Sequence, residues 1–238
     1  MRKKALITGA SRGIGAAAAG ILAKDGYDLC LVCQNSAKEM DRVREETERE
    51  GISCQTFLCD VSDPKQVETM IGQAGEIHVL INNAAKSYVG LLTDMSLEQW
   101  HQIINTNLNS LFYLCRLVVP QMVRRKSGKI INISSVWGNA GASMETAYSA
   151  SKGGVNSFTR ALAKELAPSN IQVNGIAFGV IDTDMNRCFS EEELRALREE
   201  IPIGRMGSTK EAAQMIRQVL NAPDYLTGQI ITMDGGWI

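Results

Sequence analysis

Seven short runs of apolar and β-branched residues recur along the chain, and helical patterns of apolar positions separate them. The runs cover residues 4–8, 28–33, 53–58, 77–82, 129–134, 171–176 and 229–233. Strands that alternate with helices are typical of βαβ units, in which the strands form one parallel sheet with helices on both faces. The pattern predicts a single α/β domain over residues 1–238, with a doubly wound sheet of about seven strands.

Several of the predicted helices begin at residues that cap helix N-termini. Asp63 precedes a proline and stands three residues before Gln66, and serines stand three residues before Gln or Glu at three further places. These pairs are Ser96 with Gln99, Ser190 with Glu193, and Ser208 with Glu211. Ligands of such a sheet bind at the carboxyl ends of the strands, near the point where the strand order reverses.

Composition and charge exclude several classes of function. Apolar residues make up 45% of the chain, charged residues 21%, and the net charge is −1, so nothing attracts the whole chain to nucleic acid or anionic lipid. No apolar run reaches membrane-spanning length, and Gly9, Ser11 and Arg12 interrupt the first run, so no export signal is expected. Six cysteines without the spacing of a disulfide framework favour a reducing, cytoplasmic compartment.

Two features that suggest metal or redox chemistry have simpler explanations. Cys30 and Cys33 form a C-x-x-C pair inside a predicted strand. Positions i and i+3 of a strand face opposite sides, so these thiols diverge and we interpret them as buried apolar residues. His78 and His101 lie in separate predicted elements, which argues against a metal site.

A glycine-rich turn follows the first predicted strand. It reads GASRGIG over residues 9–15 and opens a helix of small residues. Glycines let the backbone approach a pyrophosphate, and the helix N-terminus offers free N–H groups to it. The spacing G-x-x-x-G-x-G differs from G-x-G-x-x-G, but its context between strand and helix is the one that a Rossmann-type dinucleotide site requires. The expected cofactor-binding residues of this turn are Gly9, Ser11, Arg12, Gly13, Ile14 and Gly15.

Two later segments end predicted strands and belong to the same expected site. Asp60 and Val61 follow the third strand, where a carboxylate can accept from an adenine amino group. Taken alone, Asp60 is more often a helix-entry residue. Asn83 and Ala84 follow the fourth strand, where small residues let a cofactor lie against the backbone.

Tyr148 and Lys152 are four residues apart and share one face of a predicted helix. Lowering the pKa of a phenol from about 10 to about 7 requires roughly 4 kcal/mol. A cation about 5 Å away at an effective dielectric of 20 supplies about 3 kcal/mol. The same spacing is common on helix surfaces, but Ser135 ends the fifth strand, where its hydroxyl can hold a carbonyl oxygen. Asn107 lies in an apolar helical region, which suggests a bound water or an exposed backbone carbonyl.

In this order and spacing, the motifs resemble the short-chain dehydrogenase/reductase family over essentially the full chain. Residues 201–207 and 225–236 are similar to the closing segments of its 3-oxoacyl-acyl-carrier-protein reductases. The matching residues are Thr8, Gly9, Gly13, Ile14, Gly15, Asp60, Val61, Asn82, Asn83, Ala84, Asn107, Ser135, Tyr148, Lys152, Ile181 and Thr183.

The resemblance implies a role for each of four polar residues. Tyr148 is the general acid for carbonyl reduction and the base for alcohol oxidation. Lys152 lowers the pKa of that phenol and holds the nicotinamide ribose. Ser135 positions the carbonyl, and Asn107 supports a water that links Lys152 to solvent.

The resemblance also places the nicotinamide end of the cofactor near the sixth strand. Thr183 and the backbone near Ile181 would anchor the carboxamide. Two residues depart from the family pattern. Ala85 stands where the family has glycine, and Phe178 stands where it has proline. Both departures bear on cofactor affinity, and neither removes a catalytic group.

The resemblance implies that residues 184–207 cover the substrate. Five apolar residues are expected to form a wall there, or else to belong to the core or a subunit contact. They are Trp137, Met144, Met185, Phe189 and Met206. The basic run 124–126 has two interpretations: it docks an acyl carrier protein, or it complements a helix C-terminus.

Three functions follow, of which the first is favoured. It is NADPH-dependent reduction of a 3-oxoacyl thioester to a 3-hydroxyacyl thioester, as in fatty acid biosynthesis. The second is a related reductase or dehydrogenase of a sugar, polyol or small ketone. The third is a nucleotide-binding regulator without turnover, against which Ser135, Tyr148 and Lys152 argue.

The end of the second strand favours NADPH over NADH. NAD-selective sites place an acidic residue there to hold the ribose 2′-hydroxyl. Here residues 34–36 read QNS, with no acid before Glu39. Arg12 is placed to pair with a 2′-phosphate, and its planar guanidinium suits bidentate contact.

We predict a homo-oligomer, specifically a homotetramer, from the apolar C-terminal residues Trp237 and Ile238 and from the resemblance. Light scattering at micromolar concentration should give about four times the chain mass of 26.0 kDa. A monomer at that concentration would contradict the prediction.

Overall fold

The computed structural model describes the backbone of residues 2–238 and the side chains of all of these except Arg187 and Cys188. Its centre is one seven-stranded parallel sheet with the order β3-β2-β1-β4-β5-β6-β7. The strands are β1 (Lys4–Thr8), β2 (Asp28–Cys33), β3 (Cys54–Leu58), β4 (Val79–Asn82), β5 (Gly128–Ser135), β6 (Ile171–Phe178) and β7 (Ile230–Met233). All seven predicted runs are therefore confirmed, and no end moves by more than two residues.

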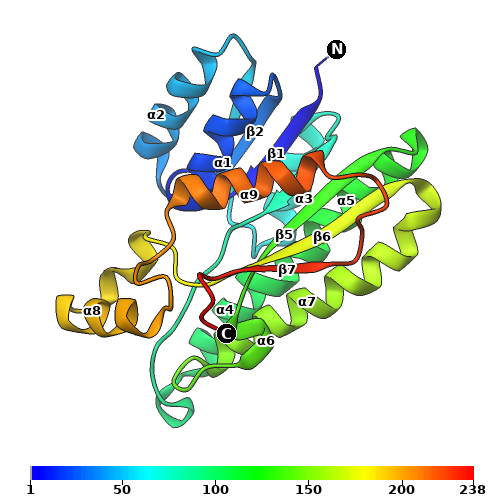
Figure 1. Ribbon diagram of the computed structural model, residues 1–238. Coiled ribbons are helices and arrows are strands. Elements are labelled where there is room, and N and C mark those ends of the chain that lie inside the picture. The colour runs from blue at the N-terminus through cyan, green and yellow to red at the C-terminus, as the bar shows by residue number, and fades with distance from the viewer. Residues whose placement is uncertain (1) are drawn as a thin grey trace.

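Helices cover both faces of the sheet (Figure 1). One core layer contains residues of α1, α2 and α9, and the other contains residues of α3, α5 and α7. The α-helices are α1 (Gly13–Lys24), α2 (Ala37–Glu48), α3 (Pro64–Ala74), α4 (Leu97–Ile104), α5 (Ser110–Arg125), α6 (Trp137–Ala140), α7 (Thr146–Leu166), α8 (Glu191–Glu200) and α9 (Thr209–Asn221). Short 3-10 turns lie at η1 (Leu92–Asp94), η3 (Ala167–Ser169) and η4 (Asp184–Cys188), and a π-helical turn lies at η2 (Asn105–Asn109).

The predicted helix starts form as expected. Asp63 accepts hydrogen bonds from the backbone N–H groups of Lys65 and Gln66 and so caps α3. Ser96, Ser190 and Ser208 each form a complete capping box with the Gln or Glu three residues later. These local signals needed no tertiary contact, because a cap satisfies N–H groups within its own first turn.

The two thiols of the C-x-x-C pair lie on opposite faces of β2, as predicted. Cys30 packs into the core beneath α3 and α5, whereas Cys33 packs into the core beneath α1 and α2. Burial raises the pKa of Cys30 to about 12, so this thiol stays protonated. Among the described residues, no three His, Cys, Asp or Glu side chains are grouped to hold a metal ion.

The basic run at the end of α5 lies far from the strand ends that carry the predicted site. Arg125 pairs with Glu76 at 2.6 Å and donates to the Ile77 carbonyl at 2.9 Å. Lys126 ends the helix with φ 52°. Because β5 begins at Gly128, this run lies at the edge where strands start, which favours the helix-terminus interpretation over carrier docking.

The strand order reverses between β1 and β4. From β1 the chain moves outward to β2 and β3, then returns to β4 and continues outward on the other side to β7. Loops that leave β1 and β4 in opposite directions open a crevice at their carboxyl ends. Within residues 2–238, no helix is long and apolar enough to span a bilayer.

Candidate active site

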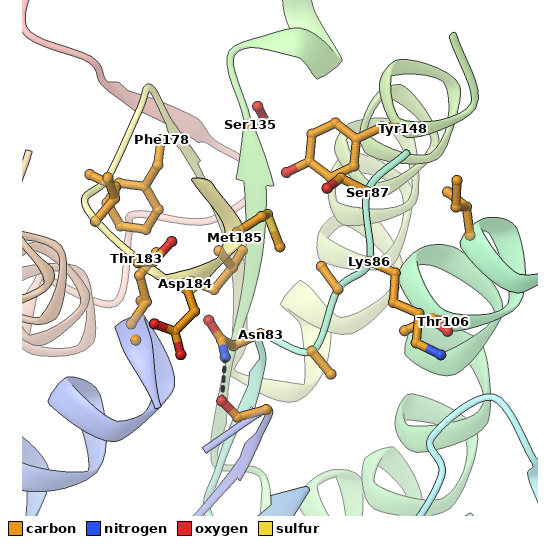
Figure 2. Close-up of a pocket in the computed structure, with 18 of the residues that line it drawn as sticks. Asn83, Lys86, Ser87, Thr106, Ser135, Tyr148, Phe178, Thr183, Asp184 and Met185 are labelled. Carbon is orange, nitrogen blue, oxygen red and sulfur yellow. Dashed lines mark hydrogen bonds between the residues drawn. The ribbon is translucent and has the colours of Figure 1, made fainter. Parts of the chain in front are cut away.

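One large cleft of about 770 Å³ opens at these strand ends. This volume lies within the range of small-molecule and cofactor sites. Figure 2 shows Asn83 at the centre, Phe178, Thr183, Asp184 and Met185 on one side, and Tyr148, Lys86 and Thr106 on the other. Fourteen of the sixteen residues predicted to be catalytic or cofactor-binding line this cleft, and the other two, Gly15 and Asn107, lie behind its walls.

The glycine loop is tied to the end of β4 by Thr8 and Asn83. The Thr8 hydroxyl accepts hydrogen bonds from the backbone N–H groups of Asn83 and Ala84, both at 3.0 Å. The Asn83 amide donates back to the carbonyl oxygens of Thr8 and Gly9, at 2.8 and 3.1 Å. The dashed line in Figure 2 marks one of these bonds from Asn83. The loop is therefore held in place before any ligand binds.

Two of the loop glycines serve this internal packing. A methyl group at Gly15 would clash with the Gly9 carbonyl oxygen and come within 2.7 Å of the Asn83 amide nitrogen. Gly13 has φ +58°, a conformation that side chains with a β-carbon rarely adopt. Close approach to a pyrophosphate, which the sequence suggested, is therefore only one reason why glycine is needed at these positions. The packing and the backbone conformation of the loop also require it.

Arg12 is the N-cap residue of α1, but its side chain makes no capping bond. It crosses the cleft mouth toward Asp184, with Nε and Oδ2 at 3.5 Å and exposed fractions of 61% and 36%. Exposed ion pairs of this kind contribute about 0–1 kcal/mol. The uncapped N-terminus of α1 leaves backbone N–H groups facing the cleft, which suits a phosphate.

Asp60 lies at the cleft, but it is also a structural hub. One of its oxygens accepts from both the backbone N–H and the hydroxyl of Ser62, and the other accepts from Gln34 at 2.7 Å. Gln34 is thus engaged, while Asn35 and Ser36 of the same strand end also line the cleft. This arrangement agrees with the interpretation of Asp60 as a helix-entry residue. It also agrees with the predicted position of Asp60 beside a cofactor.

On the other side of the cleft, the chain after β6 forms a shelf. Ile181 is 7% exposed, and its carbonyl accepts from the Asn186 amide at 2.8 Å. Thr183 approaches the glycine loop, with its methyl group 3.4 Å from the position of a β-carbon at Gly13. Phe178 is 3% exposed and continues the β6 ladder opposite Ser135, so this departure from the family pattern leaves the strand regular.

Ser135, Tyr148 and Lys152 meet on the wall between β5 and α7. Figure 2 shows the Tyr148 ring directed toward the strand end that carries Ser135. The Lys152 ammonium lies 5.5 Å from the centre of the Tyr148 ring and donates to the Ile133 carbonyl at 2.8 Å. The two side chains therefore share one face of α7, as the spacing of four residues predicts.

The electrostatic expectation for the phenol is wrong for the protein chain by itself. Burial and then the charge of Glu145 raise the pKa of Tyr148 to about 12, and the Ser135 hydroxyl only partly opposes this. Burial also lowers the pKa of Lys152 to about 8. Tyr148 retains some exposed surface in the cleft, but its ring lies deep enough for desolvation to dominate. Both groups are thus driven toward their neutral forms, because removal from water penalises charge.

The amide of Asn107 is fully used within the protein. Its oxygen accepts from the Lys86 backbone N–H, and its nitrogen donates to the Lys86 carbonyl, both at 2.8 Å. The nitrogen also donates to the Ser151 hydroxyl at 3.0 Å, and Ser151 donates to the Tyr148 carbonyl. Asn107 lies in the π-helical turn, a form that often marks functional sites. The side-chain amide is therefore paired within the protein, and the water role stays a prediction.

The predicted apolar wall forms only in part. Trp137, Met185 and Phe189 line the cleft, whereas Met144 and Met206 are not among the described residues that line it. Met144 lies at the outer rim and is 46% exposed.

Several lining residues were missed by sequence reasoning. Trp237 packs edge-to-face on Trp137 with ring centres 4.8 Å apart. Part of the apolar C-terminal surface therefore makes a contact within its own chain. Glu145 stands three residues before Tyr148, and residues at this spacing share one face of a helix. The sequence therefore contained a sign that Glu145 lies near Tyr148. Lys86 follows Ala85 directly and lies in the loop after β4. The further missed residues are Ser87, Tyr88, Val89, Gln99, Gln102, Ile103, Thr106 and Leu197.

The donor set fits a dinucleotide. A helix N-terminus, small residues at two strand ends and a cleft that runs from Ser36 to Tyr148 match an elongated ligand with phosphates near its middle. Residues of the glycine loop would hold the phosphates, and Thr183 and Lys152 lie where the far end would bind.

Comparison with known proteins agrees with this geometry. A model of the short chain dehydrogenase family matches residues 3–194. An uncharacterised oxidoreductase of Bacillus subtilis is 38% identical over 242 residues, covering 100% of this chain and 99% of that protein. A 3-oxoacyl-[acyl-carrier-protein] reductase of Staphylococcus aureus is 37% identical over 241 residues, covering 99% and 98%.

Solved structures are similar along the whole chain. An actinorhodin polyketide ketoreductase, a Phe-to-Trp variant solved with NADPH, gives a TM-score of 0.93 at 30% identity, covering 99% of this chain and 97% of that one. The acetoin dehydrogenase of Salmonella typhimurium gives 0.90 at 30% identity, covering 100% and 96%. The chain belongs to the short-chain dehydrogenase/reductase family and is an NAD(P)-dependent oxidoreductase.

The buried Lys152 should lower the stability of the fold. Its pKa falls from 10.5 to about 8 in the folded chain, so the unfolded chain binds more protons between these values and stability rises with pH there. We expect Lys152→Met to raise the free energy of unfolding at pH 7 by about 2 kcal/mol. The lowered pKa costs the wild type about 3 kcal/mol, and the hydrogen bond that the variant loses offsets about 1 kcal/mol of this gain.

The gain in the free energy of unfolding of Lys152→Met over the wild type should be largest below pH 8 and should vanish by about pH 10.5. Urea denaturation across this range measures it, with Lys164→Met, an exposed lysine of the same helix, as the control. An advantage that does not change with pH would contradict the prediction.

Proposed function

We propose that this protein uses NADPH to reduce the 3-oxo group of an acyl thioester to a 3-hydroxyl group. The observation that carries the proposal is the meeting of Ser135, Tyr148 and Lys152 on the wall of a cleft whose other end is a glycine loop. The support for the thioester is the name of several full-length relatives, which are 3-oxoacyl-[acyl-carrier-protein] reductases at 36–37% identity.

When bound, the nicotinamide cofactor supplies the hydride. The chain supplies the proton and the orientation. Ser135 donates from its hydroxyl to the substrate carbonyl oxygen and so places it beside Tyr148. The phenol holds its proton at neutral pH because burial raises its pKa, and it donates that proton to the same oxygen. The Lys152 ammonium, 5.5 Å from the ring centre, then stabilises the phenolate that remains.

The proposed cofactor preference rests on Arg12 and the end of β2. Asn35 and Ser36 line the cleft, no acidic residue stands at this strand end before Glu39, and Ser36 precedes α2 with no side-chain capping bond. Arg12 would exchange Asp184 for a ribose 2′-phosphate, because an exposed ion pair is weak. The Asp184 carboxylate opposite this site would moderate the preference.

A second candidate function is the reduction of a small, polar ketone. The observation that favours it is the polar lining near Tyr148, where Ser87, Glu145 and Gln99 border the cleft. The structural likeness to an acetoin dehydrogenase supports it as well. A nucleotide-binding regulator without turnover remains the third candidate.

Residues 184–207 are proposed to cover the substrate. Met185, Phe189 and Leu197 of this segment face the cleft, and Figure 1 shows α8 extending beyond the sheet. The proposed assembly is a homotetramer, and Phe112 and Val123 of α5 leave apolar surface exposed at 51% and 38%. An acyl carrier protein is the proposed carrier of the substrate.

NADPH oxidation with acetoacetyl-CoA and a panel of small ketones separates the three functions. Turnover of the thioester supports the first, turnover of ketones alone supports the second, and tight cofactor binding without turnover supports the third.

Catalysis should depend on the phenol of Tyr148. Tyr148→Phe should lower kcat by a factor of about 10²–10⁴, the usual contribution of a general acid, and leave the NADPH dissociation constant nearly unchanged. The control is Tyr225→Phe, because Tyr225 is 100% exposed. If Tyr148→Phe retained more than half of the wild-type kcat, the assignment of the proton donor would be wrong.

Arg12 should select NADPH. We expect Arg12→Ala to reduce the ratio of kcat/KM with NADPH to kcat/KM with NADH by about tenfold. Most of this change should come from a lower kcat/KM with NADPH, since a charge-assisted hydrogen bond contributes about 1.5–3 kcal/mol. Arg42→Ala removes the same charge from an exposed position on α2 and should change neither cofactor. A wild type that prefers NADH, or equal losses for both cofactors, would refute this role of Arg12.

A further inference from the structure

Glu145 is a carboxylate on the wall of the reacting end of the cleft. It stands at the N-cap position of α7, one helical turn before Tyr148. Helix N-caps are commonly Ser, Thr, Asp or Asn, and the longer Glu145 side chain makes no capping bond. It lines the cleft together with Trp137, Trp237 and Tyr148 instead. The side chain therefore borders the space in which a substrate would bind.

The loop that carries Glu145 is held by two hydrogen bonds and contains one residue in an uncommon conformation. Met144 has φ 63°, an uncommon conformation for a residue with a side chain. Its carbonyl accepts from the Gly90 backbone N–H at 2.8 Å, which joins this loop to the one after β4. The Ser149 hydroxyl accepts from the Ala142 backbone N–H at 3.0 Å. A loop fixed in this way gives the carboxylate a defined position before a substrate arrives.

The electrostatic environment connects Glu145 to the reacting phenol. Burial raises the pKa of Glu145, and the neighbouring Trp137 indole partly opposes the rise. The charge of Glu145 in turn raises the pKa of Tyr148, and both side chains line the same cleft. The Lys152 cation is the nearest positive charge on the same helix, and it is directed to the Ile133 carbonyl.

We propose that Glu145 is a specificity-determining residue that rejects carbonyl substrates bearing a free carboxylate next to the reacting group and admits their uncharged esters, thioesters or amides. The proposal rests on the proposed function and deepens it. A 3-oxoacyl thioester is uncharged where the corresponding free 3-oxo acid carries a carboxylate. Two like charges about 7 Å apart at an effective dielectric of 20 repel strongly enough to change binding by tenfold or more.

The test compares acetoacetate with ethyl acetoacetate, which share one ketone and differ by one charge. Wild type should reduce the ester with a kcat/KM at least about tenfold above that of the acid. Glu145→Gln keeps the size of the side chain and removes its charge, and it should raise the acid-to-ester ratio by about tenfold. Glu145→Ala should do the same, because neither change removes a capping bond.

The matched control is Glu165→Gln, which removes one negative charge from an exposed position on the same helix, outside the cleft. It should leave the ratio at the wild-type value. An unchanged ratio in Glu145→Gln, or an equal change in the control, would overturn the proposal. A role of Glu145 in folding alone would lower both activities together and leave the ratio unchanged.

A binding measurement separates this proposal from the proposed function. Quenching of tryptophan fluorescence reports ligands near Trp137 and Trp237, and it is measured for both compounds with NADP present. If wild type reduces neither compound but binds the ester in preference to the acid, and Glu145→Gln removes that preference, the proposed reaction is wrong and the role of Glu145 stands. Equal binding of both compounds by wild type overturns the role of Glu145.

Discussion

The site depends on the bonds between Thr8 and Asn83 at the point where the strand order reverses. Neighbouring strands β1 and β4 send their chains in opposite directions there, and without a tie the two loops would separate. One hydroxyl accepts two backbone N–H groups, and one amide donates to two carbonyl oxygens. These four bonds satisfy backbone groups that the sheet leaves unpaired, and they bring the glycine loop against Ala84. The cofactor end of the cleft has its shape for this reason.

A second set of polar contacts holds the catalytic end. Asn107 joins the loop after β4 to α7 through Lys86 and Ser151. The small residues between Tyr148 and Lys152 thus have tasks of their own, since Ser151 bonds to Asn107 and Ser149 fixes the preceding loop. Buried polar groups are costly unless they are paired, and here the pairing also joins the start of α7 to the loops around it.

Stability and chemistry oppose each other at Lys152. The fold places an ammonium among buried groups, with one carbonyl as its hydrogen-bond partner, and its pKa falls accordingly. Such a residue is a stability cost that its position beside Tyr148 explains. The same burial keeps the phenol protonated, which suits a proton donor. Glu145 adds a negative charge to this pair, so the cleft combines an acid, a cation and an anion on a single helix.

The sequence by itself determined the sheet, the caps and the identity of the main polar residues. Apolar runs and capping pairs are local signals in the sequence, so β1, β2 and the box at Ser96 appear where the pattern predicts them. Only the tertiary structure decided the direction of the Tyr148 pKa shift, the packing of Trp237 on Trp137 and the place of Glu145 in the cleft. These features depend on burial and on contacts between segments far apart in the chain. The helical spacing of Tyr148 and Lys152 gives their separation, but it does not give the amount of water that the fold removes from around them.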